Sequence, residues 1–410
     1  MASDATWLRD LDVEARATPY PGGALFGEEE RVALDRVLSS GVLSGFVASP
    51  GDHHLGGPEV RALEAQWAEL GSYRHVVAVN SATAGLHAGV VAMELPKGGE
   101  VIVPPLTMSA TIAAVRMAGC EPVFADLDPE LFVLTAATIE PAITERTVGI
   151  VVVHLFGQLA PMGPIRELAA RHGLKVLEDA AQAPGATQDG EWPGHGTCGA
   201  VFSFNQNKTI TCGEGGLLVT DDDRVAAIAR LVRNHAESVV HDFPDIDAEG
   251  LVGWNYRPTE LDAAVARCQT DRLTHLTEWR RGLAEQFTAT LDGIDGLRPP
   301  VVHPGNRHVW FTYPARFDAE AWGVPRETVV AALQEAGIPC APGYVQPLYG
   351  LPLFGDHGPS PDGFPATERI ARQELINFFV CRWPATSDDI GHAGEVLHAL
   401  WSQRDRLAER

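Results

Sequence analysis

Between residues 76 and 220 the chain alternates short apolar runs with longer amphipathic stretches. Short runs of aliphatic residues bounded by turn residues are typical of buried strands, and apolar positions spaced by three or four residues are typical of helices. The predicted strands are Val76–Val79, Glu100–Val103, Pro122–Phe124, Ile150–Val153, Val176–Leu177, 200–204 and 216–220. The predicted helices start at Ala84 and cover Ala110–Ala118 and Met162–His172. This alternation predicts an α/β protein with a large doubly wound, mixed or parallel sheet and crossover helices.

The segments on either side of this region predict an N-terminal arm and a second, smaller domain. Helices are expected at Glu28–Leu38 and at Pro58–Leu70, where Pro58 suits the first turn of a helix. The stretch Ser39–Gly57 is rich in Gly, Ser and His and predicts a long loop, the kind of segment that often carries function.

A long helix is predicted from Thr259 to about Thr290, leading away from the sheet. The elements expected after it are a segment at Trp310–Tyr313, a helix at Arg326–Ala336 and a last helix after Thr386. We therefore expect a large domain over residues 1–270, with the N-terminal arm, and a smaller C-terminal α/β domain over residues 271–410.

Composition and charge narrow the classes of partner. The 410 residues are 45% hydrophobic and carry a formal net charge of −23, which weighs against non-specific binding to nucleic acid or to an anionic membrane. The strongest apolar run, Val148–Phe156, is far too short to cross a bilayer, and the N-terminus lacks the pattern of a secretory signal. The six cysteines form no CxxC pair, so we expect reduced thiols, no metal site and a cytoplasmic location.

An acid and a lysine follow two of the predicted strands. Asp179 comes after Val176–Leu177, and Lys208 comes after the strand at 200–204. Ligands of open α/β sheets bind at the carboxyl ends of the strands. A carboxylate and a reactive lysine suit pyridoxal phosphate, because the lysine forms a Schiff base with it and the acid keeps its pyridine nitrogen protonated. On these two residues alone, a strand-end acid and a surface lysine without chemistry remain an alternative.

The segment Asn80–Gly85 lies between a predicted strand and a predicted helix. Its small residues allow backbone N–H groups to approach an anion, and the Thr83 hydroxyl adds a donor. The alternative is an ordinary helix cap and tight turn. Ser203 is a second candidate phosphate donor or an ordinary strand serine. Gln182 is positioned to reach a ring oxygen, or simply starts a helix.

Six ordered segments together resemble one known family, the DegT/StrS-type sugar aminotransferases, which are fold-type I pyridoxal phosphate enzymes. The segments are Asn80–Gly85, Val101–Thr107, His154–Gln158, Glu178–Ala183, Phe202–Gly216 and Asn255–Leu261. The resemblance extends over about residues 20 to 400. It implies a pyridoxal 5'-phosphate-dependent aminotransferase that moves an amino group from L-glutamate or L-glutamine to a keto-sugar.

The resemblance also implies roles for individual residues. Lys208 matches the lysine of the Schiff base, Asp179 the partner of the pyridine nitrogen, and Gln182 the residue at the ring's 3-hydroxyl. The implied phosphate contacts are Thr83, Ala84 and Ser203.

Three further positions bear on assembly and on the fit of the cofactor. Asn255 matches a residue that reaches the phosphate of the neighbouring subunit's cofactor, which implies a homodimer with composite sites. Arg257, in the same segment, could meet the phosphate, the substrate or only its own domain. Met108 stands where many relatives have an aromatic residue that stacks on the cofactor, and a methionine can still cover a ring face.

The acceptor is the least determined part of this interpretation. A nucleotide-linked 4-keto or 3-keto deoxysugar of amino-sugar or secondary-metabolite biosynthesis, including antibiotics, ranks first, and a cyclitol ketone related to scyllo-inosose ranks second. A few family members have His in place of the lysine and are dehydratases, so Lys208 places this chain with the aminotransferases. A catalytically silent, sugar-binding relative is the remaining alternative.

Two irregular segments, Ser44–Gly57 and Tyr344–Tyr349, are expected to border the acceptor site. His53, His54 and Tyr344 are the candidate contacts, with plain surface loops as the alternative. A diphosphate would need local basic partners, since the net charge of −23 repels it. Arg257 and Arg233 are the first candidates for that role.

Overall fold

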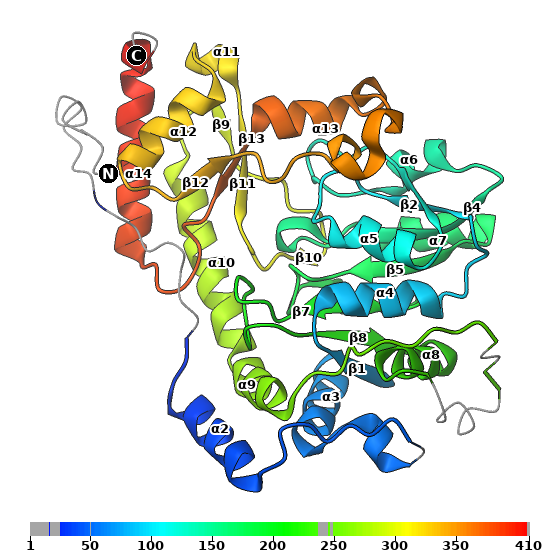
Figure 1. Ribbon diagram of the computed structural model, residues 1–410. Helices are drawn as coiled ribbons and strands as arrows, with labels where there is room; N and C mark the ends of the chain where they lie inside the picture. The colour runs from blue at the N-terminus through cyan, green and yellow to red at the C-terminus, as the bar shows by residue number, and fades with distance from the viewer. Residues whose placement is uncertain (1–15, 17–24, 50, 237–244, 247–248, 408–410) are drawn as a thin grey trace.

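Seven strands form the main sheet of the computed structural model, which describes residues 16, 25–49, 51–236, 245–246 and 249–407 (Figure 1). Their order is β1-β8-β7-β5-β4-β2-β3. The bounds are β1 (His75–Val79), β2 (Glu100–Val103), β3 (Glu121–Phe124), β4 (Thr147–Val153), β5 (Lys175–Asp179), β7 (Ala200–Ser203) and β8 (Gly216–Thr220). Strand β8 is antiparallel to both of its neighbours, β1 and β7, and the other neighbouring strands of this sheet are parallel to each other. The central strands are buried on both faces, which is why they read as continuous apolar runs.

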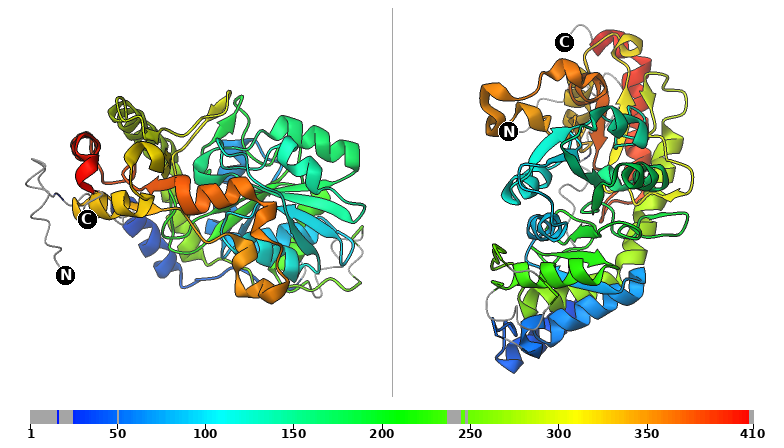
Figure 2. Two further views of the ribbon diagram at one scale, coloured as in Figure 1. Left: turned by 90° about the horizontal axis from the view of Figure 1, so that it is seen from above. Right: turned by 90° about the vertical axis from the view of Figure 1, so that its right-hand side faces the viewer.

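Helices cover both faces of this sheet (Figure 2). One face packs against α4 (Ala82–Ala92), α5 (Ala110–Met117) and α8 (Asp223–Arg233). On the other face, α3 (Pro58–Gly71) and α9 (Glu260–Asp271) cover the half formed by β1, β7 and β8. The other half of that face packs against α6 (Ala136–Ile139) and α7 (Met162–His172). Near the N-terminus, α2 (Glu28–Ser40) packs against α9.

A second, antiparallel sheet forms a separate core in the C-terminal part of the chain. Its order is β12-β13-β11-β9, with bounds β9 (Leu297–Arg298), β11 (Tyr313–Phe317), β12 (Cys340–Pro342) and β13 (Leu375–Phe378). The helices around it are α10 (Leu273–Thr290), α12 (Arg326–Glu335) and α14 (Ser387–Ser402). The short elements are β6 (Thr187–Gln188), β10 (Asn306–Arg307), α11 (Ala319–Trp322), α13 (Pro365–Arg369) and α15 (Arg404–Leu407). The division at residue 270 stays a prediction.

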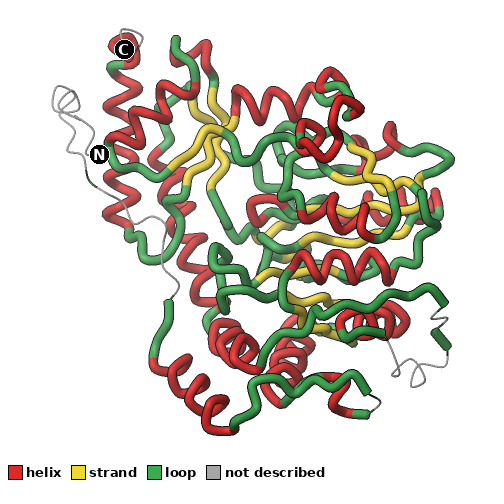
Figure 3. The backbone as a smooth tube through the Cα atoms, viewed as in Figure 1, coloured by secondary structure: helices red, strands yellow, loops and turns green. Residues whose placement is uncertain are grey.

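The predicted strands of the main sheet and the helix at Met162–His172 are confirmed to within a few residues, but two features differ. The strand at 216–220 does not continue the parallel pattern, because the connection before it contains no crossover helix and returns as an antiparallel turn (Figure 3). The single helix predicted from Thr259 to Thr290 is wrong. It breaks at Arg272, whose side chain reaches back to Leu25 and Glu30, and α10 then runs toward the second sheet.

Within the described part of the chain, no helix is long and apolar enough to span a membrane. The same residues contain no group of three or more His, Cys, Asp or Glu side chains arranged to hold a metal ion. The six cysteines are free thiols.

Arg233, at the end of α8, is fully buried and ties that helix to the edge of the main sheet. Its Nη1 donates to Glu64 Oε1 at 2.6 Å and to the carbonyl oxygen of Ala78 at 3.0 Å. Its guanidinium lies 4.7 Å from the ring centre of Phe46. The expectation that Arg233 contacts an acceptor diphosphate is therefore wrong, because this side chain is part of the core.

Arg233→Met is expected to destabilise the protein by about 3 to 5 kcal/mol, because removing one partner leaves the Glu64 carboxylate without its buried counter-charge. The measurement is the shift of the denaturation midpoint. Arg224→Met on the same helix is the matched control, since Arg224 and Glu94 form an exposed pair that water and salt screen, and its loss should cost much less. Equal shifts for the two variants would contradict a structural role for Arg233.

Candidate active site

The carboxyl ends of the parallel strands gather the chemically active side chains at one edge of the main sheet. Asp179 is the last residue of β5, and Ser203 is the last residue of β7. Lys208 lies in the turn between β7 and β8, where its N–H donates to the carbonyl oxygen of Asn205 at 2.8 Å. Because β8 returns antiparallel, this turn stays at the same edge as Asp179.

Asp179 is held in place through both carboxylate oxygens. Thr111 Oγ1 donates to Oδ2 at 3.0 Å, and the backbone N–H of Ala181 donates to Oδ1 at 3.1 Å. Burial raises the pKa of Asp179, while these hydrogen bonds and the Lys208 charge oppose the shift. Sequence reasoning missed Thr111, which reads as an ordinary helical residue until α5 is packed against β5.

Lys208 is partly exposed as a residue, yet its amine is enclosed enough for burial to lower its pKa, against the attraction of Asp179. A lysine with a lowered pKa has more of the neutral amine that acts as a nucleophile. Its Nζ lies 4.8 Å from the ring centre of Phe311. The backbone N–H of Phe311 donates to Phe156 at 2.9 Å, which brings the C-terminal part of the chain to this edge. Phe311 carried no signal in the sequence.

Gln182 and Tyr344, two predicted site residues from distant segments, contact each other. Gln182 Nε2 donates to the Tyr344 hydroxyl at 2.8 Å, and its Oε1 accepts from the backbone N–H of Phe156 at 2.7 Å. Burial raises the pKa of Tyr344 to about 12, so its hydroxyl stays protonated at neutral pH. The structure therefore places Tyr344 beside a candidate cofactor residue rather than only at an outer rim.

A buried pair, His154 and Glu178, supports the same edge. The backbone N–H of Ala160 donates to His154 Nδ1 at 3.1 Å, so the imidazole proton lies on Nε2 and is donated to Glu178 Oε2 at 2.8 Å. Glu178 Oε1 accepts from Gly194 and Thr197 at 2.9 and 2.8 Å. This pair fixes the ends of β4 and β5 next to Asp179.

The start of α4 and the end of β7 form the candidate anion cradle. Ser81 caps α4, with its hydroxyl accepting from the N–H of Ala84 at 3.1 Å, and Thr83 is exposed in the first turn. The Ser203 hydroxyl accepts from the N–H of Asn205 at 3.3 Å, which leaves its proton to be donated. A helix N-terminus favours a phosphate. With the enclosed lysine and the buried acid at one edge, these residues fit pyridoxal phosphate.

The remaining predicted contacts differ in their exposure. Met108 is 58% exposed after β2, and His53 is exposed in the loop before α3. His54 is buried, and its Nδ1 meets Asn234 Nδ2 at 3.2 Å. It faces a protein amide, so the expected direct contact with a sugar is corrected for His54. Asn255 is exposed, and its Oδ1 accepts a hydrogen bond from Arg257 Nε at 2.9 Å.

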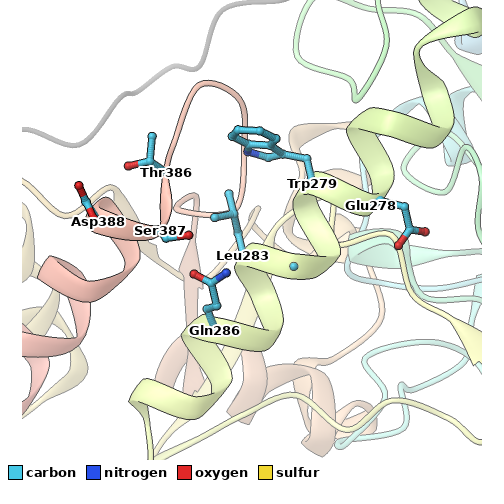
Figure 4. Close-up of a pocket in the computed structure, with 8 residues that line it drawn as sticks. Glu278, Trp279, Leu283, Gln286, Thr386, Ser387 and Asp388 are labelled. Atoms are coloured by element: carbon cyan, nitrogen blue, oxygen red, sulfur yellow. The ribbon is translucent and has the colours of Figure 1, made fainter.

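A cavity of about 400 Å³ lies away from these residues, between α10 and the start of α14 (Figure 4). Trp279 and Leu283 form its apolar wall, and Glu278 and Asp388 make its rim acidic. It does not share residues with the edge that holds Asp179 and Lys208.

Residues 47–381 match the DegT/DnrJ/EryC1/StrS aminotransferase family. The chain belongs to this family. The match covers most of the described residues and includes every side chain named above at the edge of the main sheet.

Solved structures agree with this assignment. DesV of S. venezuelae, solved in complex with a ketimine intermediate, is 31% identical over 92% of this chain and 95% of its own, with a TM-score of 0.79. DesI, solved in the presence of its TDP-sugar product, is 29% identical over 97% and 96%, with a TM-score of 0.83. 3-Amino-5-hydroxybenzoic acid synthase is 26% identical over 96% and 100%, with a TM-score of 0.81. This family member is a pyridoxal phosphate-dependent aminotransferase of fold type I.

Asp179→Asn is expected to make the cofactor-free enzyme more heat-stable at neutral pH. The folded pKa of Asp179 lies above its unfolded value. The protonated carboxyl therefore stabilises the fold below the unfolded pKa, and that contribution is lost as pH rises through the folded pKa. Asparagine stays uncharged, so the melting temperature of the variant should exceed that of the wild type at about pH 7, and the gap should close toward about pH 4.

The measurement is thermal unfolding of the cofactor-free protein across this pH range. Asp128→Asn removes a charge from a partly exposed turn and controls for the loss of charge alone. Adding pyridoxal phosphate should raise the melting temperature of the wild type more than that of Asp179→Asn. A wild type that melts above Asp179→Asn at neutral pH without cofactor would contradict a destabilising buried charge.

Proposed function

We propose that this aminotransferase moves an amino group from L-glutamate or L-glutamine to a nucleotide-linked keto-deoxysugar, in amino-sugar or secondary-metabolite biosynthesis. The observation that carries the proposal is the similarity to DesV and DesI over almost the whole chain, together with the TDP-sugar product of DesI. A cytoplasmic location, expected from the composition, belongs to the same proposal.

In this proposal Lys208 binds the cofactor and later moves a proton. Bound pyridoxal phosphate supplies the electron sink that lets the donor's α-carbon lose its proton. The Nζ of Lys208, whose pKa burial lowers, would accept that proton from the α-carbon and donate it, as a general acid, to C4′ of the cofactor. Phe311 beside the amine excludes water from this transfer.

Three groups hold the cofactor in this proposal. Asp179, fixed by Thr111, would keep the pyridine nitrogen of a bound cofactor protonated, as the partner of its positive charge. Gln182, fixed by Tyr344 and the Phe156 backbone, faces the ring hydroxyl. The phosphate contacts are Thr83, Ala84 and Ser203, at a helix N-terminus that favours an anion.

We also propose that the active unit is a homodimer in which Asn255 reaches the neighbouring subunit's cofactor phosphate. Asn255 is exposed, and its segment presents Val252 and Trp254 to solvent with 63% and 41% of their surfaces exposed. Exposed apolar residues beside an exposed amide suit a surface that a second copy covers in a two-fold arrangement.

A cyclitol ketone is the second candidate acceptor, and one observation favours it. A diphosphate needs local cations, but Arg233 is buried against Glu64, and Arg257 donates to Asn255 and Asn234. The two arginines first expected to meet a diphosphate are therefore engaged within the protein. A cyclitol needs no such partners.

Lys208→Ala is expected to lose the visible absorbance of lysine-bound cofactor and to lower turnover by several orders of magnitude, because both the covalent bond and the proton carrier are removed. Absorbance spectra and single-turnover kinetics are the measurements. Lys175→Ala, the same change at the outer end of β5, serves as the control and should behave as the wild type. Normal transamination by Lys208→Ala would refute the assignment.

The acceptor class is tested by incubating the enzyme with nucleotide-linked 3-keto and 4-keto deoxysugars and with cyclitol ketones, and by detecting the amine product by mass. We expect amination of a nucleotide-linked sugar, and inhibition of that reaction by the free nucleoside diphosphate. Amination of a cyclitol ketone alone, without inhibition by the nucleotide, would replace the first candidate by the second.

A further inference from the structure

Arg257 contacts the side chain of Asn255 rather than facing open solvent. Its Nε donates to Asn255 Oδ1 at 2.9 Å, and its Nη1 donates to Asn234 Oδ1 at 3.3 Å. Two of its three guanidinium nitrogens are thus directed at protein acceptors.

The guanidinium decides which way the amide of Asn255 points. Arginine has hydrogen-bond donors and no acceptor, so the atom of Asn255 that faces it must be the carbonyl oxygen. The NH2 group of Asn255 is then directed away from Arg257. Since Asn255 is exposed, it presents a donor outward, which is the group a phosphate oxygen accepts.

Asn234 holds Arg257 from the buried side. Asn234 is fully buried, and its Nδ2 donates to the carbonyl oxygen of Val47 at 3.1 Å and meets His54 Nδ1 at 3.2 Å. This use of Nδ2 fixes its Oδ1 toward Arg257. A chain of hydrogen bonds therefore connects the loop before α3 to Asn234, Asn234 to Arg257, and Arg257 to the amide of Asn255.

The backbone holds both asparagines in the same register. Asn234 and Asn255 form an isolated antiparallel bridge. On either side of it, the N–H of Trp254 donates to Val232 at 2.7 Å and the N–H of Tyr256 donates to Arg233 at 2.9 Å. Asn80, in the turn before α4, donates from its Nδ2 to the carbonyl oxygen of Asn255 at 3.2 Å.

From these contacts we infer that Arg257 is a positioning residue: it orients the amide of Asn255 so that the NH2 group donates to the cofactor phosphate of the neighbouring subunit. The inference rests on the composite-site dimer of the proposed function. In this inference Arg257 does not contact the substrate. Asn234 and His54 hold Arg257 in place and so help to orient the amide of Asn255.

The test is a double-mutant cycle on Arg257→Met and Asn255→Ala, with cofactor affinity as the readout. The affinity is measured from the visible absorbance that the protein retains after dialysis against decreasing concentrations of pyridoxal phosphate. Each single change should weaken cofactor binding by roughly tenfold, the scale of one charge-assisted hydrogen bond. The double variant should bind no more weakly than Asn255→Ala, because Arg257 acts only through that amide. The KM for the acceptor should not change in Arg257→Met.

Two results would overturn the inference while leaving the dimer intact. A further loss of cofactor affinity when Arg257→Met is added to Asn255→Ala, or a raised acceptor KM, would show that Arg257 meets an anion itself. Arg257→Gln, which keeps an amide donor and a shorter side chain, should lie between wild type and Arg257→Met. If Arg257→Met fails to fold, Arg257→Gln takes its place in the double-mutant cycle.

Asn255→Ala separates this inference from the proposal beneath it. If sedimentation gives an active monomer, or if Asn255→Ala binds the cofactor as tightly as wild type, the composite site is refuted together with the role of Arg257. If Asn255→Ala weakens binding in a dimer and Arg257→Met does not, the composite site stands and only the positioning role is wrong.

Discussion

The active edge depends on keeping two ionisable groups, Asp179 and Lys208, out of water at the ends of neighbouring strands. Desolvation raises the pKa of Asp179 and lowers the pKa of Lys208, so burial favours the neutral form of each group over the charged form that it has in water. Thr111 and the Ala181 backbone offset part of this cost for Asp179. The arrangement is unfavourable for the protein alone. In the proposed site a bound cationic ring would offset this cost and would thereby link stability to cofactor binding.

The direction of one strand decides whether those groups can meet. Because β8 is antiparallel, the chain turns at the carboxyl end of β7 and leaves Lys208 there, instead of carrying it into a crossover helix. The helix break at Arg272 also decides which side chains reach Lys208, although it lies much further along the chain. It redirects the chain to the second sheet, whose entry segment returns Phe311 to the lysine.

The two arginines that the sequence suggested as anion contacts are engaged within the protein. Arg233 and Arg257 are both used to hold other groups, Glu64 in one case and Asn255 with Asn234 in the other. A guanidinium with fixed acceptors gives a defined geometry because its donors are rigidly arranged. The two arginines thereby fix the orientation of their acceptors, the Glu64 carboxylate and the side-chain amides of Asn255 and Asn234. This role can be seen only when the partners are known.

The sequence by itself determined the apolar strands, most helices of the main sheet, and the candidates Asp179, Lys208, Gln182 and Ser203, because strand ends and turn residues are local signals. It did not determine the direction of β8, the break at Arg272, or the contacts of Thr111 and Phe311. It also placed Arg233 and His54 at a substrate, where the structure places them in the protein interior. Hydrogen-bond partners and burial depend on residues far apart in the chain, so only the tertiary structure could decide which polar side chains face a ligand and which hold the fold.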